Sequence, residues 1–390
     1  MNLVSDDVLD QMKSLKNASV MIDNHWLRPA SVNDVLDCMK QFPKYFIRQG
    51  GTGGYKKFQK QDHDVVIDIS AVDDLKNISV EDDCLTIGSG ATFTNIIKYL
   101  KTLTTTDSII TELLRVITNL ASPQVRNVAS LGGSLLWNHP ASDLTPLLLA
   151  AGAELEIMDT DRDTRTVSLT DSSSLQPGHL LISVHVPLNK KQVKFFKHAR
   201  RSTADLAIAN LALSYNTTDD TNKITDVEVW VGGIGLAVKY CPQRIVKKTE
   251  NIEKMMMNNS LDKITTEMIC DAVEADLAVS DEHSDLEKTA FRVSLVTGFL
   301  IKFIESVKSG AGLETEKRSY KSHQLFDKTP ADQPVMDPVT RPLPHISSAE
   351  QCSGEAVYVD DLPTYQREVS LYPVQVILSS DWLIYLNAEV

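Results

Sequence analysis

The chain has 390 residues, and at roughly 150 residues per domain this length predicts two to three domains. Apolar residues make up 42% and charged residues 23%, which is typical of folded globular proteins and argues against disorder or a fibrous repeat. The formal net charge is −13, so the chain lacks the clustered cations with which nucleic-acid-binding proteins contact phosphates, and no nucleic-acid partner is expected.

The cysteines are five in number and widely spread, with no Cys-x-x-Cys pair, at Cys38, Cys84, Cys241, Cys270 and Cys352. This pattern argues against a disulfide framework, a zinc ribbon or an iron–sulfur cluster held by four thiolates of this chain. Met1 to Asn17 contains no apolar leader, and runs such as Leu147 to Ala153 fall far short of the ~20 residues that span a bilayer. We therefore expect a cytoplasmic protein with no membrane partner.

The first part of the chain predicts strands and helices in alternation. Residues 20–22 and then 26–29 predict a short strand that ends in a turn. Ser31 with Asp34 indicates an N-capped helix containing Val35, Leu36 and Met39. Strands at 45–47, 65–69 and 85–87 and a helix at 94–100 follow. The strand at 45–47 runs directly into Gly50-Gly51-Thr52-Gly53-Gly54. This order favours an α+β domain with a ligand at the glycine loop.

The first domain is predicted to continue into the middle of the chain, where a second, smaller α+β domain follows it. The first domain continues with helices at 111–120 and 144–153 and strands at 155–157 and 180–186. After Lys190-Lys191 a meander is expected, with strands at 195–197, 211–215 and 227–231, followed by helices at 266–278 and about 286–307.

The last part of the chain is predicted to be a linker and the beginning of another domain. Ser309 to Pro338 is polar and carries several prolines, which is typical of a linker. From Gln351 a third piece begins and stops at Val390, and about forty residues cannot bury enough surface to fold alone. We therefore expect this piece to be incomplete or to lean on its neighbours.

Two glycine-containing segments are the candidates for ligand binding. Glycine permits close backbone approach, so successive N–H groups of Gly50 to Gly54 could surround a phosphate, although a tight structural turn is the alternative. Ser130-Leu131-Gly132-Gly133-Ser134 forms a second small-residue cluster, with Asp143 ten residues after Gly133. A dinucleotide could lie between the two, with Asp143 accepting from a sugar hydroxyl. Alternatively, Gly132-Gly133 permits close packing and Asp143 caps the helix at Leu144. The histidines never pair at ligand spacing, so no metal site is expected.

Three segments resemble one known family. Gln124 to Ile157 ("QVRNVASLGGSLLWNHPASDLTPLLLAAGAELEI") is similar to the flavin domain of the xanthine dehydrogenase/aldehyde oxidase family of molybdo-flavoenzymes. Phe195 to Tyr215 resembles the start of its flavoprotein C-terminal domain, and Arg341 to Pro363 resembles its junction toward the molybdenum-cofactor region. The segments occur in family order and span nearly the whole chain.

The resemblance implies a domain order and a set of cofactors. It implies a lead-in at 1–17, an FAD-binding domain of the p-cresol methylhydroxylase (PCMH) type at 18–190 and a CO dehydrogenase flavoprotein C-terminal-like domain at 191–308. A linker at 309–350 and the incomplete start of an a/b hammerhead domain at 351–390 would follow. FAD would bind in this segment, whereas 2Fe–2S clusters and molybdopterin would belong to flanking regions. Those regions would be partners, with O₂ or NAD as electron acceptor and a homodimer as the expected assembly.

The resemblance also implies which residues contact FAD. Gly50, Gly51 and Thr52, with Gly53 and Gly54, would hold the pyrophosphate. Ser130, Gly132, Gly133 and Ser134 would form a second loop, and Asp143 would match the family's acidic contact. Leu120, Leu181 and Lys197 would border the flavin. No residue of this chain is expected to be catalytic, because the cofactor carries the chemistry.

Several positions depart from the family pattern. Gly51 replaces Asn, the loop before Tyr55 is about two residues shorter, Leu120 replaces an aromatic residue, and Trp137 replaces a small polar one. Ser172 to Gly178 is shorter than the segment that helps to admit NAD, which favours O₂ or no acceptor. The alternative hypothesis is therefore a degenerate or truncated, non-catalytic fragment that binds no flavin.

Overall fold

The computed structural model describes residues 20–23, 26–53, 63–104, 107–137, 139–174, 178–188, 191–201, 203–218, 223–234, 246–277, 286–309, 331–339, 341 and 345–363. The chain divides into two compact units, Met1–Thr315 and Glu316–Val390, and each is considered by itself. The predicted lead-in over residues 1–17 lies outside the described residues, as do Gly54 and the chain from 364 onward.

The first sheet of the larger unit has four strands in the order β1-β2-β4-β3. Its strands are β1 (Val20–Asp23), β2 (Trp26–Arg28), β3 (Tyr45–Arg48) and β4 (Val65–Asp68), and β4 is parallel to both β2 and β3. Helix α2 (Val32–Gln41) packs its apolar side into the same core as Val65 and Ile67. The Ser31 hydroxyl accepts a hydrogen bond from the Asp34 backbone N–H at 3.2 Å, so the predicted N-cap is confirmed.

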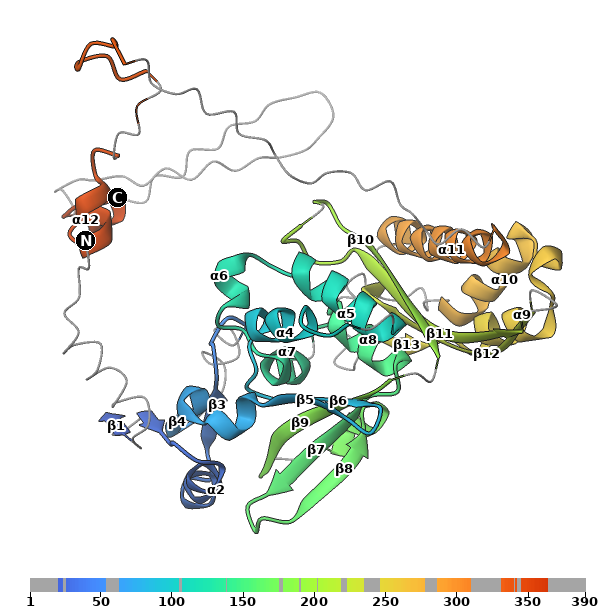
Figure 1. The fold of residues 1–390 in the computed structure, drawn as a ribbon, viewed down its shortest axis with the longest axis horizontal. Coiled ribbons are helices and arrows are strands. Elements are labelled where there is room, and N and C mark those ends of the chain that lie inside the picture. Colours follow the sequence, from blue (N-terminus) through green and yellow to red (C-terminus); the bar gives the residue numbers. More distant parts are fainter. Residues whose placement is uncertain are drawn as a thin grey trace, which may run out of the picture. The chain divides into compact units, whose positions relative to one another are not determined.

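The second sheet is antiparallel, with five strands in the order β5-β6-β9-β7-β8. Its edge strands are β5 (Ile78–Glu81) and β8 (Thr164–Ser168), and between them lie β6 (Cys84–Gly88), β9 (His179–Pro187) and β7 (Glu154–Asp159). Helices α4 (Phe93–Leu100), α5 (Ser108–Asn119), α6 (Pro123–Arg126), α7 (Leu131–Trp137) and α8 (Leu144–Ala150) gather on one side of this sheet (Figure 1). Sequence patterns predicted the central strands but not the two edge strands, of which β8 is mostly exposed and β5 is half-buried.

The third sheet is the predicted meander, β10 (Gln192–His198), β11 (Ala209–Thr218), β12 (Lys223–Gly232) and the short β13 (Lys247–Lys248). One face packs on the first core through Phe195, Ala212 and Trp230. The other face packs Leu211 and Leu213 against α9 (Glu250–Asn258), α10 (Thr266–Leu277) and α11 (Leu286–Ser309) (Figure 1). Each face of this sheet packs against a different apolar core, so the sheet connects the cores of the two predicted domains.

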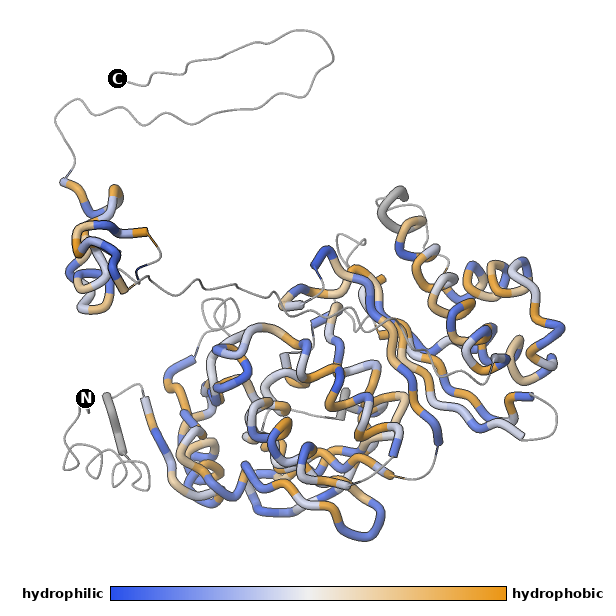
Figure 2. The backbone as a smooth tube through the Cα atoms, turned by 45° about the horizontal axis from the view of Figure 1, so that its top comes forward, coloured by the Kyte–Doolittle hydropathy of each residue, from blue (hydrophilic) through white to orange (hydrophobic). Residues whose placement is uncertain are grey.

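Short 3-10 turns complete the elements, at Ile69–Ala71, Asp73–Lys76, Leu169–Ser174 and Leu261–Lys263. Hydrophobic and hydrophilic residues alternate in short runs along the described chain (Figure 2), and among the described helices none is long and apolar enough to span a membrane. In the smaller unit the structure describes α12 (Ser348–Ser353), which ends at Gly354 with φ 80°, and a 3-10 turn at Val359–Asp361.

Two glycines determine how closely the backbone segments beneath the glycine loop approach each other. A Cβ at Gly50 would lie 1.9 Å from the Val128 carbonyl oxygen. At Gly132, on α7, it would lie 2.7 Å from both Cβ and the carbonyl oxygen of Ser89, which follows β6. The Gly132 N–H donates to that carbonyl at 2.9 Å. Neighbouring backbone atoms therefore exclude a side chain at both positions. As a result, the glycine loop packs directly on Val128, and the first turn of α7 packs directly on Ser89.

Because of this packing, a glycine-to-alanine substitution should have opposite effects on stability in α7 and in α11. Gly132→Ala forces Cβ into Ser89 and should lower the free energy of unfolding by about 1–3 kcal/mol. Gly298→Ala in α11, where an added Cβ meets nothing within 4 Å, should instead raise it by about 0.5–1 kcal/mol, because alanine favours the helix. Urea denaturation of both variants measures the difference, and an equal effect of the two would contradict the packing argument.

Candidate functional site

A cavity of about 550 Å³ lies in the larger unit where the two glycine segments meet. Its volume is in the range of small-molecule and cofactor sites. Most of the residues predicted to contact a dinucleotide line it, namely Gly50, Gly51, Thr52, Gly53, Leu120, Ser130, Gly132, Gly133, Ser134, Asp143 and Leu181. Gly54 lies outside the described residues, and Lys197 contacts the cavity through Asp143. Segments nearly eighty residues apart in sequence therefore line one hollow.

The loop after β3 places a cation beside its glycines. Gly51 has φ 70°, which glycine adopts without strain, and the Arg48 guanidinium lies against it, within 2.7–3.2 Å of where a Cβ would stand. Arg48 also lies 4.9 Å from the Trp26 ring centre and 3.8 Å from an Asp68 oxygen. Sequence analysis missed Arg48, although its position at the end of a strand entering a glycine loop was a usable signal. It gives the loop a positive charge to face an anion.

The second glycine segment is a helix, so the prediction of a second loop was wrong. Leu131 to Trp137 form α7, and the Ser130 hydroxyl accepts from the Gly133 N–H at 3.2 Å. A bridge between Thr92 and Ser130 and the Gly132–Ser89 contact pin this first turn. Tertiary packing therefore imposes helix on a Gly-Gly pair whose own preference is for a turn.

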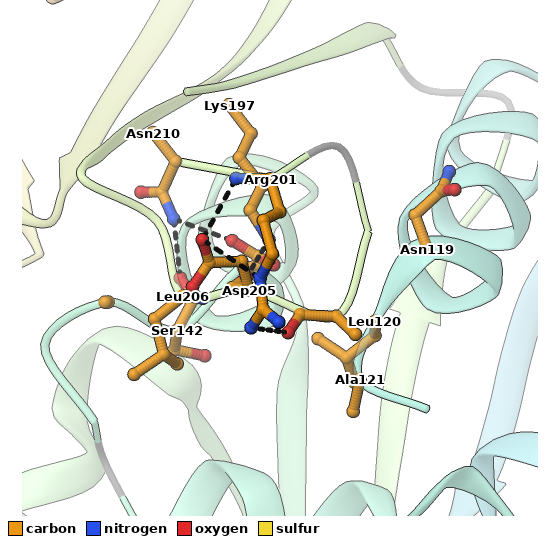
Figure 3. A network of polar contacts seen from close by, with 12 residues as sticks. Asn119, Leu120, Ala121, Ser142, Lys197, Arg201, Asp205, Leu206 and Asn210 are labelled. Carbon is orange, nitrogen blue, oxygen red and sulfur yellow. Dashed lines mark hydrogen bonds and ion pairs between the residues drawn. The ribbon is translucent and has the colours of Figure 1, made fainter. Parts of the chain in front are cut away.

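Asp143 is held by a buried polar network rather than by the helix that follows it. Its carboxylate accepts from the Lys197 ammonium at 2.5 Å and from the Asn210 amide at 3.2 Å. Lys197 also donates to the Asp205 carbonyl at 2.8 Å, and Asn210 to the Ser142 carbonyl at 2.9 Å (Figure 3). Burial raises the pKa of Asp143, and the attraction and hydrogen bond of Lys197 offset part of that rise.

The alternative that Asp143 caps α8 is therefore excluded by its contacts. The Asp143 side chain makes no cap hydrogen bond. The Ser142 hydroxyl accepts from the Thr145 N–H at 3.2 Å instead and takes the role of the cap. Asp143 is left to link the first domain to strands β10 and β11 while it lines the cavity.

Two alanines in left-handed backbone stand at the cavity wall. Ala121 has φ 47° and Ala204 has φ 53°, and both line the cavity. Arg126 holds the first by donating to the Leu120 and Ala121 carbonyls at 2.6 and 2.8 Å, while Arg201 donates to the Ala204 carbonyl at 3.0 Å. Leu120, Ala121 and Asp205 all line the cavity, and Figure 3 labels them together with Arg201. Such strained positions persist where surrounding contacts over-determine them, and they cluster at functional sites.

Aromatic and aliphatic side chains form the apolar part of the wall. Trp137 packs on Gly53, where a Cβ would lie 3.0 Å from the indole ring, and its ring centre is 4.7 Å from that of His139. Burial lowers the pKa of His139, which favours the neutral ring. Leu120 and Leu181 also line the cavity. The cavity therefore combines a flat apolar wall with a glycine loop, as a ligand with a ring system and a phosphate requires.

Two polar groups on the cavity floor, Ser89 Oγ and Gln49 Oε1, have no hydrogen-bond partner among the residues that the structure describes. Ser89 is 5% exposed, and the Gln49 amide nitrogen donates to the Gly90 carbonyl at 3.2 Å. Buried polar groups are rarely left unpaired without a ligand or water. Together with the glycine loop and Arg48, these groups fit a dinucleotide cofactor. Neither residue was singled out from the sequence, since the signal is burial rather than type.

Family models match both parts of the larger unit. The model described as the FAD binding domain in molybdopterin dehydrogenase matches residues 18–189. The CO dehydrogenase flavoprotein C-terminal domain matches residues 194–307.

Relatives in sequence are longer enzymes. The chain is 27% identical over 384 residues to aldehyde oxidase 1 of Bos taurus, with 89% of this chain and 28% of that protein covered. It is likewise 27% identical over 387 residues to xanthine dehydrogenase/oxidase of Gallus gallus, with the same shares covered. The chain thus spans about 28% of the length of the curated relatives that it matches.

Solved structures share the fold. Quinoline 2-oxidoreductase of Pseudomonas putida 86 aligns with a TM-score of 0.60 and 18% identity, covering 74% of this chain and 99% of the matched one. Reconstituted CO dehydrogenase of Oligotropha carboxidovorans aligns with a TM-score of 0.59 and 19% identity over 75% of this chain and 100% of the matched one. With the two family models in order and oxidoreductase relatives along most of its length, the chain belongs to the xanthine dehydrogenase/aldehyde oxidase family of molybdo-flavoenzymes, as its FAD-binding segment.

Proposed function

We propose that this chain binds FAD in the 550 Å³ cavity and serves as an electron-transfer segment of a xanthine dehydrogenase/aldehyde oxidase-like enzyme. The observation that carries the proposal is the meeting of the Gly50 loop, the first turn of α7 and Asp143 in one hollow. Bound FAD would supply the redox chemistry, taking electrons from 2Fe–2S clusters and passing them to O₂ or NAD. The chain's own residues bind, orient and shield it.

The residue roles follow the position of each group in the cavity. Gly50, Gly51, Thr52 and Gly53 hold the diphosphate, and Arg48 offers the diphosphate a counter-charge. Gly54 is assigned to the same loop by the resemblance alone. The first turn of α7 contributes Ser130, Gly132, Gly133 and Ser134. Leu120 and Leu181 border the flavin ring as part of the apolar wall.

Lys197 has a positioning role in this proposal. Its ammonium is 2.5 Å from Asp143 and is shared with the Asp205 carbonyl, so most of its charge is neutralised locally. It therefore affects a bound flavin chiefly by keeping Asp143 ionised and aimed at the cavity, where the carboxylate accepts from a sugar or polyol hydroxyl.

The wider assembly is also a proposal. Iron–sulfur and molybdenum domains are the expected partners, and the chain is expected to form a homodimer. The domain boundaries are those implied by the resemblance. The described cysteines, Cys38, Cys84, Cys270 and Cys352, are free, as they would be in a cytoplasmic protein. The shortened 172–178 segment favours O₂ over NAD.

Flavin binding is tested by titrating the purified 390-residue chain with FAD and following flavin fluorescence. We expect saturable binding and a yellow protein. Gly133→Leu, whose side chain enters the cavity with only the Ser130 hydroxyl at 3.0 Å to meet it, should weaken binding at least about tenfold.

Gly298→Leu is the matched control, because it places the same side chain in a helix where nothing lies within 4 Å. It should leave FAD affinity unchanged. A colourless wild-type chain that takes up no flavin would instead support the alternative, a fragment without cofactor.

Replacing the cation of the buried network should produce a pH-dependent loss of stability. Lys197→Met leaves Asp143 buried without its cation, which should cost about 3 kcal/mol at pH 7. The pKa of Asp143 is already raised and would rise further, so the folded state binds the extra proton. The deficit should therefore shrink as the pH falls from 7 toward the ordinary carboxyl value of 3.8.

Urea denaturation of wild type and variant at pH 7 and pH 5 measures the change in the gap. Lys40→Met is the control, since the Lys40–Asp161 pair is exposed and screened by solvent and should contribute little to stability at either pH. A gap that stays constant or widens on acidification would contradict this account of the network.

A further inference from the structure

The two unpartnered polar groups of the cavity floor belong to residues that meet at the end of β6. Ser89 and Gly90 directly follow this strand, and Gln49 reaches them from the end of β3. The Gln49 amide nitrogen donates to the Gly90 carbonyl at 3.2 Å, and its oxygen lies 3.6 Å from where a Gly90 Cβ would be. The Ser89 Cβ lies 2.7 Å from the equivalent point on Gly132. Both groups therefore stand where the glycine loop and α7 converge.

The backbone of Ser89 is already engaged, so its side chain is what remains. The Ser89 N–H donates to the Ile182 carbonyl at 2.8 Å, and its carbonyl accepts from Gly132 at 2.9 Å. In the side chains of these two residues, the Ser89 hydroxyl and the Gln49 carbonyl oxygen have no partner within the described ranges. Leaving a buried polar group unpaired costs about 1–3 kcal/mol, so an arrangement with two of them in one cavity indicates a ligand that satisfies them.

The chemistry of the two groups restricts what that ligand presents. The Gln49 oxygen can only accept a hydrogen bond, and a fully ionised diphosphate offers no donor. The Ser89 hydroxyl can donate or accept. A hydroxyl group of the ligand suits either atom, since a hydroxyl can donate to the Gln49 oxygen and can accept from the Ser89 hydroxyl.

We propose that Ser89 and Gln49 form a hydroxyl-recognition subsite, which binds a sugar or polyol hydroxyl of the dinucleotide. This subsite rests on the proposed flavin binding and adds to it two side chains outside both glycine segments. The hydroxyl comes either from the ribityl chain or from the ribose of the adenosine half, and the two halves of FAD can be tested separately.

Ser89→Ala tests the subsite with two readouts. In the unliganded protein it removes a hydroxyl that has no partner, so the melting temperature should stay unchanged or rise. With FAD it removes a hydrogen bond, so Kd should increase about tenfold, which corresponds to about 1.4 kcal/mol. Gln49→Met, which retains the chain length without the acceptor, should weaken FAD binding by a similar factor.

Ser214→Ala is the matched control, because Ser214 is 1% exposed and its hydroxyl is also unpartnered among the described residues, yet it does not line the cavity. It should leave FAD affinity unchanged. Titrations with FMN and with ADP locate the hydroxyl: the loss in Ser89→Ala should appear with FMN for a ribityl contact and with ADP for a ribose contact.

Three outcomes would contradict the proposals, and they distinguish a failure of the subsite from a failure of the proposed function. If wild type binds FAD but Ser89→Ala binds FAD, FMN and ADP as tightly as wild type, the subsite is wrong while the proposed function stands. If Ser89→Ala lowers the melting temperature of the unliganded protein, the hydroxyl serves the fold and the subsite is overturned. Failure of wild type to bind any of the three overturns the proposed function itself.

Discussion

Close approach between backbones is the constraint on which the cavity depends. At Gly50 and Gly132 a single methyl group would collide with main-chain atoms of Val128 and Ser89. Because of these two contacts, the loop after β3 and the first turn of α7 share a floor formed by residues 89–93 and 128–130. The glycines thus have a packing role that does not depend on any bound phosphate.

A second set of contacts joins the two domains of the larger unit and completes the cavity wall. Asp143 belongs to the first domain, whereas Lys197 and Asn210 lie on neighbouring strands of the meander. Nearby, Arg115 of α5 donates to the Phe195 carbonyl at 2.6 Å and pairs with the buried Glu112. The cavity wall is therefore built from both domains, which is why Asp143 and the 204–206 segment face the same space as the glycine loop.

Local patterns predicted most strands of the larger unit but missed the two edge strands of the second sheet. The Ser31 cap, the strand at 45–47 and the long last helix follow from side-chain chemistry and periodicity, which act within a few residues. Strands β5 and β8 were missed because each has only four or five residues, none of them buried, and so carries a weak apolar pattern. The helix at 131–137 was taken for a loop because two glycines disfavour helix locally, and only packing against Ser89 overrides that preference.

By itself the sequence determined the family, the α+β character and the two glycine segments, since those rest on residue identity and order. Tertiary structure alone decided that these segments line one cavity, that Asp143 pairs with Lys197 instead of capping α8, and that Arg48, Gln49 and Ser89 belong to the site. The physical reason is burial: an unpaired hydroxyl or a buried carboxylate acquires significance only when distant segments exclude water from it, and no local pattern records that exclusion.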